Sequence, residues 1–141
     1  MSEAAPTTFP AARTPAREPA IRVIMMPKDT NALGTIFGGI ILSHIDLAGA
    51  VAAHALAPGR LVTVAMDKVE FHQPVFVGDL VSFYADLVRV GSSSLTVRVE
   101  VFVERRGPNR PRVKVTEATV VYVHVDDQGK PQKVEAEGTT P

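Results

Sequence analysis

One stretch, Asn31 to Leu56, constrains the fold more than any other part of this 141-residue chain. From Phe37 onward it consists almost wholly of apolar or small residues, with Gly38 and Gly39 at its start. This pattern predicts a long helix that is buried on most sides. A single acid, Asp46, lies in its middle, and burying a lone carboxylate in an apolar helix is costly without a partner. The acid therefore points to a role in chemistry or in assembly.

Four long stretches after the helix alternate between apolar and polar residues, as half-buried strands do. They cover Leu61 to Gln73, Leu80 to Val90, Leu95 to Glu104 and Arg112 to Val125, and a shorter strand is expected before the helix at Ile21 to Met26. Short turns connect the long stretches, so neighbouring strands should pair antiparallel. We therefore predict an α+β fold, in which the apolar face of a five-stranded antiparallel sheet covers the helix.

The alternation also predicts which side chains share a face of the sheet. In the first long strand Val62, Val64 and Met66 alternate, and the apolar positions then change parity near Asp67 and Lys68. A change of parity predicts a bulge at that point. In the last strand the residues that are in phase, and so predict one apolar face, are Val113, Val115, Val121, Val123 and Val125.

Length and composition favour a single domain. With 45% hydrophobic residues the chain has enough apolar surface for one core. We expect this domain at residues 21–126, after a flexible leader rich in proline and alanine at 1–20 and before a flexible polar tail at 127–141. The leader has no apolar run of the kind that a signal peptide needs. Because an acid at mid-membrane costs about 2.5–3.5 kcal/mol, we expect a cytoplasmic protein with no membrane partner.

Charge and residue usage exclude several classes of function. The 15 basic and 15 acidic residues are interspersed, so no nucleic-acid partner is expected. The absence of cysteine removes disulfides, thiolate metal sites and thiol nucleophiles. The four histidines are too scattered to indicate a metal site, and we expect neither a metal nor another cofactor. His54, His72 and His124 have no motif around them and are expected to be structural.

Ser43, His44 and Asp46 look like the members of a catalytic triad but cannot act as one. At about 100° per residue His44 points roughly 200° away from Asp46, whereas Ser43 shares the face of the acid. Without the histidine this is not a serine-hydrolase arrangement. Two roles for Ser43 remain open, which are to orient Asp46 or to fill a tight contact.

The start of the helix offers a second chemical group. Backbone N–H groups near Gly38 lack helical partners and lie at the positive end of the helix dipole, where they can polarise a carbonyl oxygen. Asp46 lies eight residues further along, a rise of about 12 Å. If both groups act on one substrate, they should come from two chains whose helices run antiparallel. Alternatively, the glycines and alanines of the helix serve packing alone.

Three segments resemble a known family: TNALGTIFGGIILSHIDLAGAVAA, VTVAMDKVEFHQPVFVGDLV and VGSSSLTVRVEV. Together they are similar to the hotdog-fold acyl-CoA thioesterases, specifically the short bacterial YciA-like branch related to cytosolic acyl-CoA hydrolases. The resemblance runs from about Met26 to His124. It implies a hotdog fold and hydrolysis of acyl-CoA to a free acid and coenzyme A. It also implies dimers that join their sheets edge to edge and assemble further into tetramers or hexamers.

The resemblance also implies roles for single residues. The catalytic acid of the family falls on Asp46, which would act as general base on water or as nucleophile on the thioester carbonyl. The amide side chain before the helix falls on Asn31, the carbonyl-polarising donor on Gly38 with Gly39 adjacent, and Thr63 lies near the acid. A departure is Thr35, where relatives often carry an acid. The turn that meets coenzyme A in the family falls on Gly91, Ser92, Ser93 and Ser94, although an ordinary hairpin turn would read the same way.

Two other functions stay open at this stage. A hotdog hydratase or dehydratase typically pairs a histidine with the helix acid, and no histidine precedes Gly38 in this sequence. A non-catalytic acyl-CoA-binding protein would keep the fold and the turn but would not need Asp46. Neither acyl chain length nor the basic residues that pair with the phosphates follow from the sequence.

Overall fold

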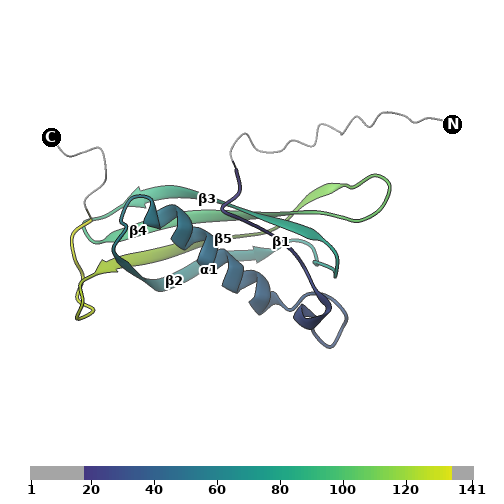
Figure 1. Ribbon diagram of the computed structural model, residues 1–141, viewed down its shortest axis with the longest axis horizontal. Coiled ribbons are helices and arrows are strands. Elements are labelled where there is room, and N and C mark those ends of the chain that lie inside the picture. The colour runs from purple at the N-terminus through teal and green to yellow at the C-terminus, as the bar shows by residue number, and fades with distance from the viewer. Residues whose placement is uncertain (1–17, 135–141) are drawn as a thin grey trace.

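Five antiparallel strands form a sheet that curls around one long α-helix in the described part of the chain, residues 18–134 of a computed structural model (Figure 1). The elements are β1 (Ile21–Ile24), a short 3-10 helix η1 (Pro27–Asp29), α1 (Gly38–His54), β2 (Arg60–Phe71), β3 (Leu80–Val90), β4 (Ser94–Glu104) and β5 (Arg112–Val125). The strand order is β1-β3-β4-β5-β2. The expected α+β class and antiparallel pairing are confirmed.

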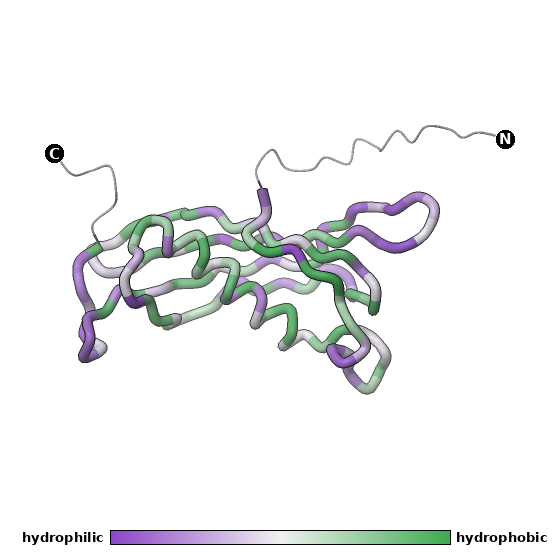
Figure 2. The backbone as a smooth tube through the Cα atoms, viewed as in Figure 1, coloured by the Kyte–Doolittle hydropathy of each residue, from purple (hydrophilic) through white to green (hydrophobic). Residues whose placement is uncertain are grey.

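The central strand β4 follows the expected alternation most closely. Its inward-facing side chains are fully buried against α1 and the neighbouring strands, namely Leu95, Val97, Val99, Val101 and Val103. The alternate side chains, including Arg98 and Glu100, therefore lie on the outer face of the sheet. Figure 2 shows hydrophobic residues along α1 and the strands, and hydrophilic residues in the loop between β4 and β5.

Helix α1 is buried on one side only, so the expectation of burial on most sides is wrong for the single chain. Ile41, Ile45 and Ala48 face the sheet and are inaccessible to solvent. Leu47 and Val51 lie on the other side and are 59% and 52% exposed. The reason is geometric, because one curled sheet covers one face of a helix. The apolar residues on the opposite face remain uncovered within this chain.

Strand β2 contains the predicted bulge and a second irregularity that the sequence did not indicate. Lys68 has a φ of 53°, and the register against β5 shifts between Asp67 and Glu70. An earlier shift between Thr63 and Ala65 changes which side chains face inward. It places Thr63 against α1 and leaves Val64 54% exposed. The expected common face of Val62, Val64 and Met66 is therefore wrong.

Strand β5 also changes its inward face along its length. The register against β4 shifts where Val101 pairs with Thr116 and Phe102 pairs with Lys114. Beyond this point alternate side chains are buried, namely Thr116, Ala118, Val120 and Tyr122, and Val125 is buried at the end of the strand. Val121 and Val123, expected to share a face with Val113 and Val115, therefore lie on the other side of the strand.

The first part of the expected flexible tail is attached to the sheet. Pro131 forms a bridge with Val125, and the Val134 N–H donates to the Ser92 carbonyl at 2.8 Å. Val134 is buried in the core cluster. Residues 127–134 therefore extend the domain beyond the expected end at 126, while 1–17 and 135–141 lie outside the described residues. Within residues 18–134, neither α1 nor η1 combines the length and the apolar character that crossing a membrane requires.

Candidate active site

Asp46 lies half-buried in the middle of α1, where its carboxylate meets β2. The Thr63 hydroxyl donates a hydrogen bond of 2.7 Å to Asp46 Oδ1. Thr63 reaches the acid because the register shift after it turns its side chain toward the helix. A hydroxyl donating to a carboxylate is a charge-assisted hydrogen bond and holds the acid in one orientation. The structure thus brings together two residues that the sequence had placed in the site.

Tyr122 of β5 holds the backbone of the same residue. Its hydroxyl donates to the Asp46 carbonyl at 2.6 Å. Gly49 permits this approach, because a Cβ atom there would lie 2.3 Å from the Tyr122 hydroxyl oxygen. Burial, and next the negative charge of Asp46, raise the pKa of Tyr122 far above its usual range. The phenol therefore stays neutral and keeps its donor.

The sequence did not single out Tyr122. The feature that could have indicated it is that Tyr122 is a single tyrosine, with a hydroxyl able to donate a hydrogen bond, among the valines of β5. That signal could be used only once the inward face of the strand was known, because a bulge decides whether Tyr122 or its neighbours point to the helix.

Ser43 and His44 do not contact the acid. The Ser43 hydroxyl donates to the Ile40 carbonyl at 2.9 Å and lies on an exposed part of α1. His44 bonds the same carbonyl through Nδ1 at 2.8 Å, and its ring stacks on Phe83 with centroids 5.5 Å apart. The exclusion of a triad is confirmed. The suggested role of Ser43 in orienting Asp46 is wrong, since Thr63 makes that contact.

Asn31 organises the loop that leads into α1. Its Oδ1 accepts hydrogen bonds from the N–H groups of Leu33 at 2.8 Å and Thr35 at 3.2 Å. Its Nδ2 donates to the Thr35 hydroxyl at 2.9 Å. Thr35, the position where relatives often carry an acid, is thus a partner of Asn31. Both the oxygen and the nitrogen of the Asn31 side-chain amide thus form hydrogen bonds within the chain. Contact of Asn31 with the substrate stays a prediction.

Gly38 and Gly39 form the first turn of α1. Phe37 precedes them with an extended backbone and gives no side-chain cap. The first N–H groups of a helix have no partner within it and carry its positive dipole end. Aromatic rings flank this turn, since a Cβ atom would lie 3.5 Å from the Phe71 ring at Gly38 and 2.7 Å from the Phe37 ring at Gly39. Both rings are more than half exposed in the single chain, so they border the turn without shielding it from water.

The Gly91 to Ser94 turn joins β3 to β4 and is tied to neighbouring segments through its carbonyls. The Gly91 N–H donates to the Ser94 carbonyl, and the Ser93 carbonyl accepts from the His124 N–H, both at 2.8 Å. The turn lies beside the end of β5, which pairs with the start of β2 at Arg60. Gly38 instead lies beside Phe71, at the other end of β2. One chain therefore holds the two expected substrate contacts at opposite ends of the sheet.

The exposed face of α1 carries an open apolar depression of about 540 Å³ close to Asp46 in sequence. Its lining includes Leu47, Ala50, Val51 and His54 of α1 and Leu61 of β2. Apolar surface of this kind marks a binding or interaction face. The depression thus lies on the uncovered side of α1, and the neighbouring residue Asp46 turns its carboxylate to the border between α1 and β2.

Comparison with known proteins shows which family and which solved structures the chain is similar to. The model of the family described as Thioesterase superfamily matches residues 33–108. The chain is 43% identical over 127 residues to the acyl-CoA thioester hydrolase YciA of Salmonella typhimurium, which covers 89% of this chain and 96% of that relative. A crystal structure of a hexameric hotdog-fold thioesterase of Campylobacter jejuni superposes with a TM-score of 0.81 at 48% identity, covering 84% of this chain and 91% of that one. A hexameric thioesterase of Yersinia pestis gives a TM-score of 0.79 at 44% identity, with coverage of 87% and 99%.

Proposed function

The chain belongs to the thioesterase superfamily and has its hotdog fold, and we propose that it hydrolyses acyl-coenzyme A thioesters to free carboxylic acids and coenzyme A. The observation that carries this proposal is the Asp46 carboxylate, half-buried in the middle of α1 and held by Thr63 of β2 at 2.7 Å. A helix acid with a fixed orientation can act as a base on the attacking water only if the thioester carbonyl is held nearby. The N-terminal amides of a second copy of α1 provide that carbonyl site.

In the proposed reaction Asp46 acts as general base on a water molecule. The water oxygen attacks the thioester carbonyl carbon while Asp46 accepts the water proton. The carbonyl oxygen gains negative charge, which the N–H of Gly38, with Gly39 adjacent, stabilises. The C–S bond then breaks, the carbonyl re-forms as the free acid, and coenzyme A leaves as a thiolate that takes up the proton. The balance needs water and no redox partner or metal.

The alternative role of Asp46 is that of nucleophile, which would form a mixed anhydride with the acyl group. A single turnover in ¹⁸O-water can detect the nucleophilic role when water attacks the aspartyl carbon of the anhydride, whereas attack at the acyl carbon labels the released acid just as a general base does. With a general base, the label enters only the released acid. Label found in the Asp46 carboxylate would show that the anhydride forms and that water attacks its aspartyl carbon.

We further propose that each site is shared by two chains. The rise from Gly38 to Asp46 is about 12 Å, too long for both groups of one helix to meet one carbonyl. An antiparallel pair of helices brings Asp46 of one chain to Gly38 of the other and covers Leu47 and Val51. Self-association fits the hexameric thioesterases that the chain resembles, and we propose a hexamer built from such dimers.

The remaining expectations extend this proposal. The Gly91 to Ser94 turn is proposed to meet the coenzyme A portion of the substrate through its hydroxyls and backbone N–H groups. Asn31 is proposed to position the acyl carbonyl near Gly38. We propose that the reaction proceeds without a cofactor and, on the resemblance to cytosolic hydrolases, that it takes place in the cytoplasm.

The experiment that tests the proposal compares Asp46→Asn with the parent in an assay of free coenzyme A release. Short, medium, long and aromatic acyl-CoAs serve as substrates. We expect the variant to keep its fold and assembly and to lose activity by about 10²- to 10⁴-fold, because the proton acceptor is removed. Asp127→Asn is the matched control, since Asp127 is an exposed acid in a turn, and should retain activity.

Two results would contradict the proposal. One is an Asp46→Asn variant that keeps parental turnover on every thioester the parent cleaves. The other is a parent that releases no coenzyme A but adds water to an α,β-unsaturated acyl-CoA, which would favour a hydratase.

A further inference from the structure

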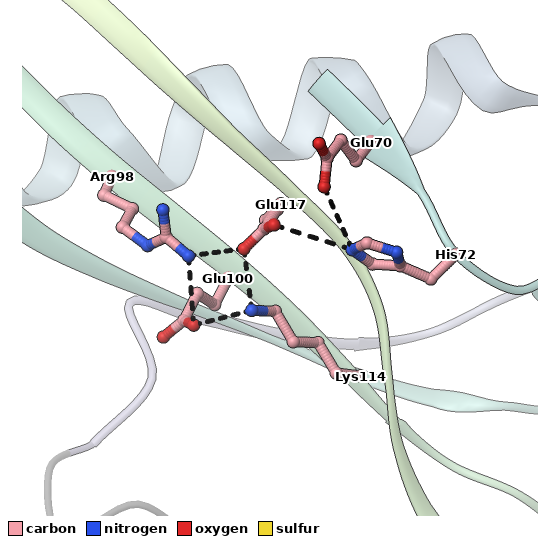
Figure 3. Close-up of polar contacts among 6 residues, drawn as sticks. All are labelled: Glu70, His72, Arg98, Glu100, Lys114 and Glu117. Carbon is pink, nitrogen blue, oxygen red and sulfur yellow. Dashed lines mark hydrogen bonds and ion pairs between the residues drawn. The ribbon is translucent and has the colours of Figure 1, made fainter. Parts of the chain in front are cut away.

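A group of charged side chains lies on the outer face of the sheet, opposite the face that packs on α1 (Figure 3). Three carboxylates form a row across neighbouring strands, because Glu70 of β2 pairs with Glu117 of β5, and Glu117 pairs with Glu100 of β4. Like charges directly opposite each other on neighbouring strands destabilise a sheet. Each gap in this row therefore requires positive charge.

The gap between Glu100 and Glu117 contains two cations. Lys114 Nζ lies 2.9 Å from Glu100 Oε2 and 2.7 Å from Glu117 Oε1. Arg98 forms ion pairs with both carboxylates, through a close contact with Glu117 Oε1 and at 3.6 Å from Glu100 Oε2. This half of the row is neutralised. Because both cations use Oε1, they also fix the Glu117 side chain, which is 17% exposed.

The gap between Glu70 and Glu117 is occupied, among the described residues, by the His72 imidazole. His72 Nε2 lies 3.7 Å from Glu70 Oε1 and 3.6 Å from Glu117 Oε2. The three ligand atoms all lie within 4.8 Å of one another. Arg98 and Lys114 both contact the Glu100 side of Glu117, and neither forms an ion pair with Glu70. One imidazole nitrogen and two carboxylate oxygens therefore converge at a point that these two cations do not occupy.

We propose that Glu70, His72 and Glu117 bind a divalent transition-metal ion such as Zn²⁺. Ligands about 2.0–2.2 Å from a tetrahedral zinc ion lie roughly 3.3–3.6 Å apart. The two distances from His72 Nε2, 3.7 and 3.6 Å, are close to this range. The Glu70 and Glu117 oxygens, within 4.8 Å of each other, reach it by rotation of the exposed Glu70 side chain. An imidazole with carboxylates favours zinc, nickel or copper over magnesium or calcium. Arg98 and Lys114 hold Glu117 as outer partners hold a metal ligand. Three protein ligands leave one coordination position for water.

This site is separate from the Asp46 centre and does not rest on the proposed activity. Glu70 and His72 flank Phe71, whose ring lies beside Gly38 on the other face of the sheet. The His72 N–H donates to the Val115 carbonyl at 2.7 Å, so β2 and β5 are already joined at this level. A metal ion here adds a link between the side chains of these two strands. It therefore stabilises the end of β2 that carries Phe71.

The test is calorimetric titration of the full chain, free of any histidine tag, with zinc chloride. We expect one ion per chain, and at least about tenfold weaker binding in Glu70→Gln and in His72→Gln, since a directly ligating group matters at least as much as an outer partner. The matched controls are Glu104→Gln, an outer-face carboxylate paired with Arg112, and His124→Gln, a histidine bonded to the Lys133 carbonyl. Both controls should bind zinc like the parent.

Thermal unfolding gives a second readout, because an ion that binds the folded chain raises its melting temperature. Zinc should raise the melting temperature of the parent and of both controls, and not that of Glu70→Gln. Circular dichroism and elution volume verify that each variant is folded and assembled. The proposal is overturned if the parent binds no zinc, if either ligand variant binds it like the parent, or if His124→Gln loses binding equally.

Discussion

At the scale of single residues, Asp46 is held at two points that have different consequences. Tyr122 fixes the position of the helix backbone through the Asp46 carbonyl, and Thr63 fixes the orientation of the carboxylate. A base must lie within hydrogen-bond reach of the proton that it takes, so the orientation of the carboxylate matters as much as its presence. Thr63 is therefore a positioning residue for the proposed reaction.

Thr63→Val replaces the hydroxyl by a methyl group of similar size. A hydrogen bond to a charged group contributes about 1.5–3 kcal/mol, so we expect kcat to fall roughly 10- to 100-fold while KM changes little. Thr63→Ser restores the hydroxyl and should recover most of kcat. Steady-state kinetics on one acyl-CoA measures both quantities. Equal kcat values for the valine variant and the parent would show that Thr63 serves packing alone.

The residues of the site differ in how far the sequence could predict them. Asp46 stands out because a carboxylate in an apolar helix is costly and therefore informative. The sequence placed Thr63 in the site only by resemblance, because its inward orientation depends on a register shift in β2. Tyr122 was missed for the same reason in β5. The charged group around His72 was missed because its members are distant in sequence and meet only through strand pairing.

At the scale of elements, the strands and the helix follow from patterns that act locally. Alternation of apolar and polar residues predicts the long strands. Pro58 and Gly59, which disfavour a continuing helix, lie between the end of α1 and the start of β2. The faces of β2 and β5 could not be predicted with the same rule, because one extra residue in a strand exchanges its two faces. The position of a bulge is set by how two strands pair, so the alternation within one strand cannot predict which side chains face inward beyond the bulge.

Two substitutions at Gly38, in the first turn of α1, separate the effect of losing its backbone N–H from the effect of adding a side chain. Gly38→Pro removes the N–H but suits the first position of a helix, and Phe37 already has the extended backbone that precedes proline. Gly38→Ala keeps the N–H, and its methyl group would lie 3.5 Å from the Phe71 ring, an ordinary contact. Loss of one oxyanion donor typically lowers kcat by about 10²- to 10³-fold.

We therefore expect Gly38→Pro to show a loss of this size and Gly38→Ala to stay close to the parent. The measurement is kcat for release of coenzyme A, with circular dichroism to confirm the helix. If the two variants lose activity equally, space beside Phe71 matters rather than the N–H donor, and the proposed role of Gly38 is wrong.

At the scale of the whole molecule, the single chain leaves uncovered both the apolar side of α1 and the edge of β2, next to the proposed site. β2 is an edge strand of 12 residues, whereas the other edge, β1, has only four. A long edge strand offers unpaired N–H and C=O groups to another chain. β2 also carries Thr63, so pairing along this edge places a second chain close to Asp46. Assembly and catalysis are thus expected to depend on the same surface.

Mixed dimers test this dependence directly. In a dimer of one Asp46→Asn chain and one Gly38→Pro chain, one of the two shared sites has both groups intact and the other has neither. Random pairing of equal amounts makes half of the dimers mixed, so about a quarter of the parental activity should return if sites are shared across the interface. Co-expression with two different affinity tags, followed by tandem purification, isolates hexamers that contain both chains. Nearly all randomly assembled hexamers do, so the purified sample should also give about a quarter of the parental activity per chain. If each site lies within one chain, these mixed hexamers should be as inactive as the two single variants.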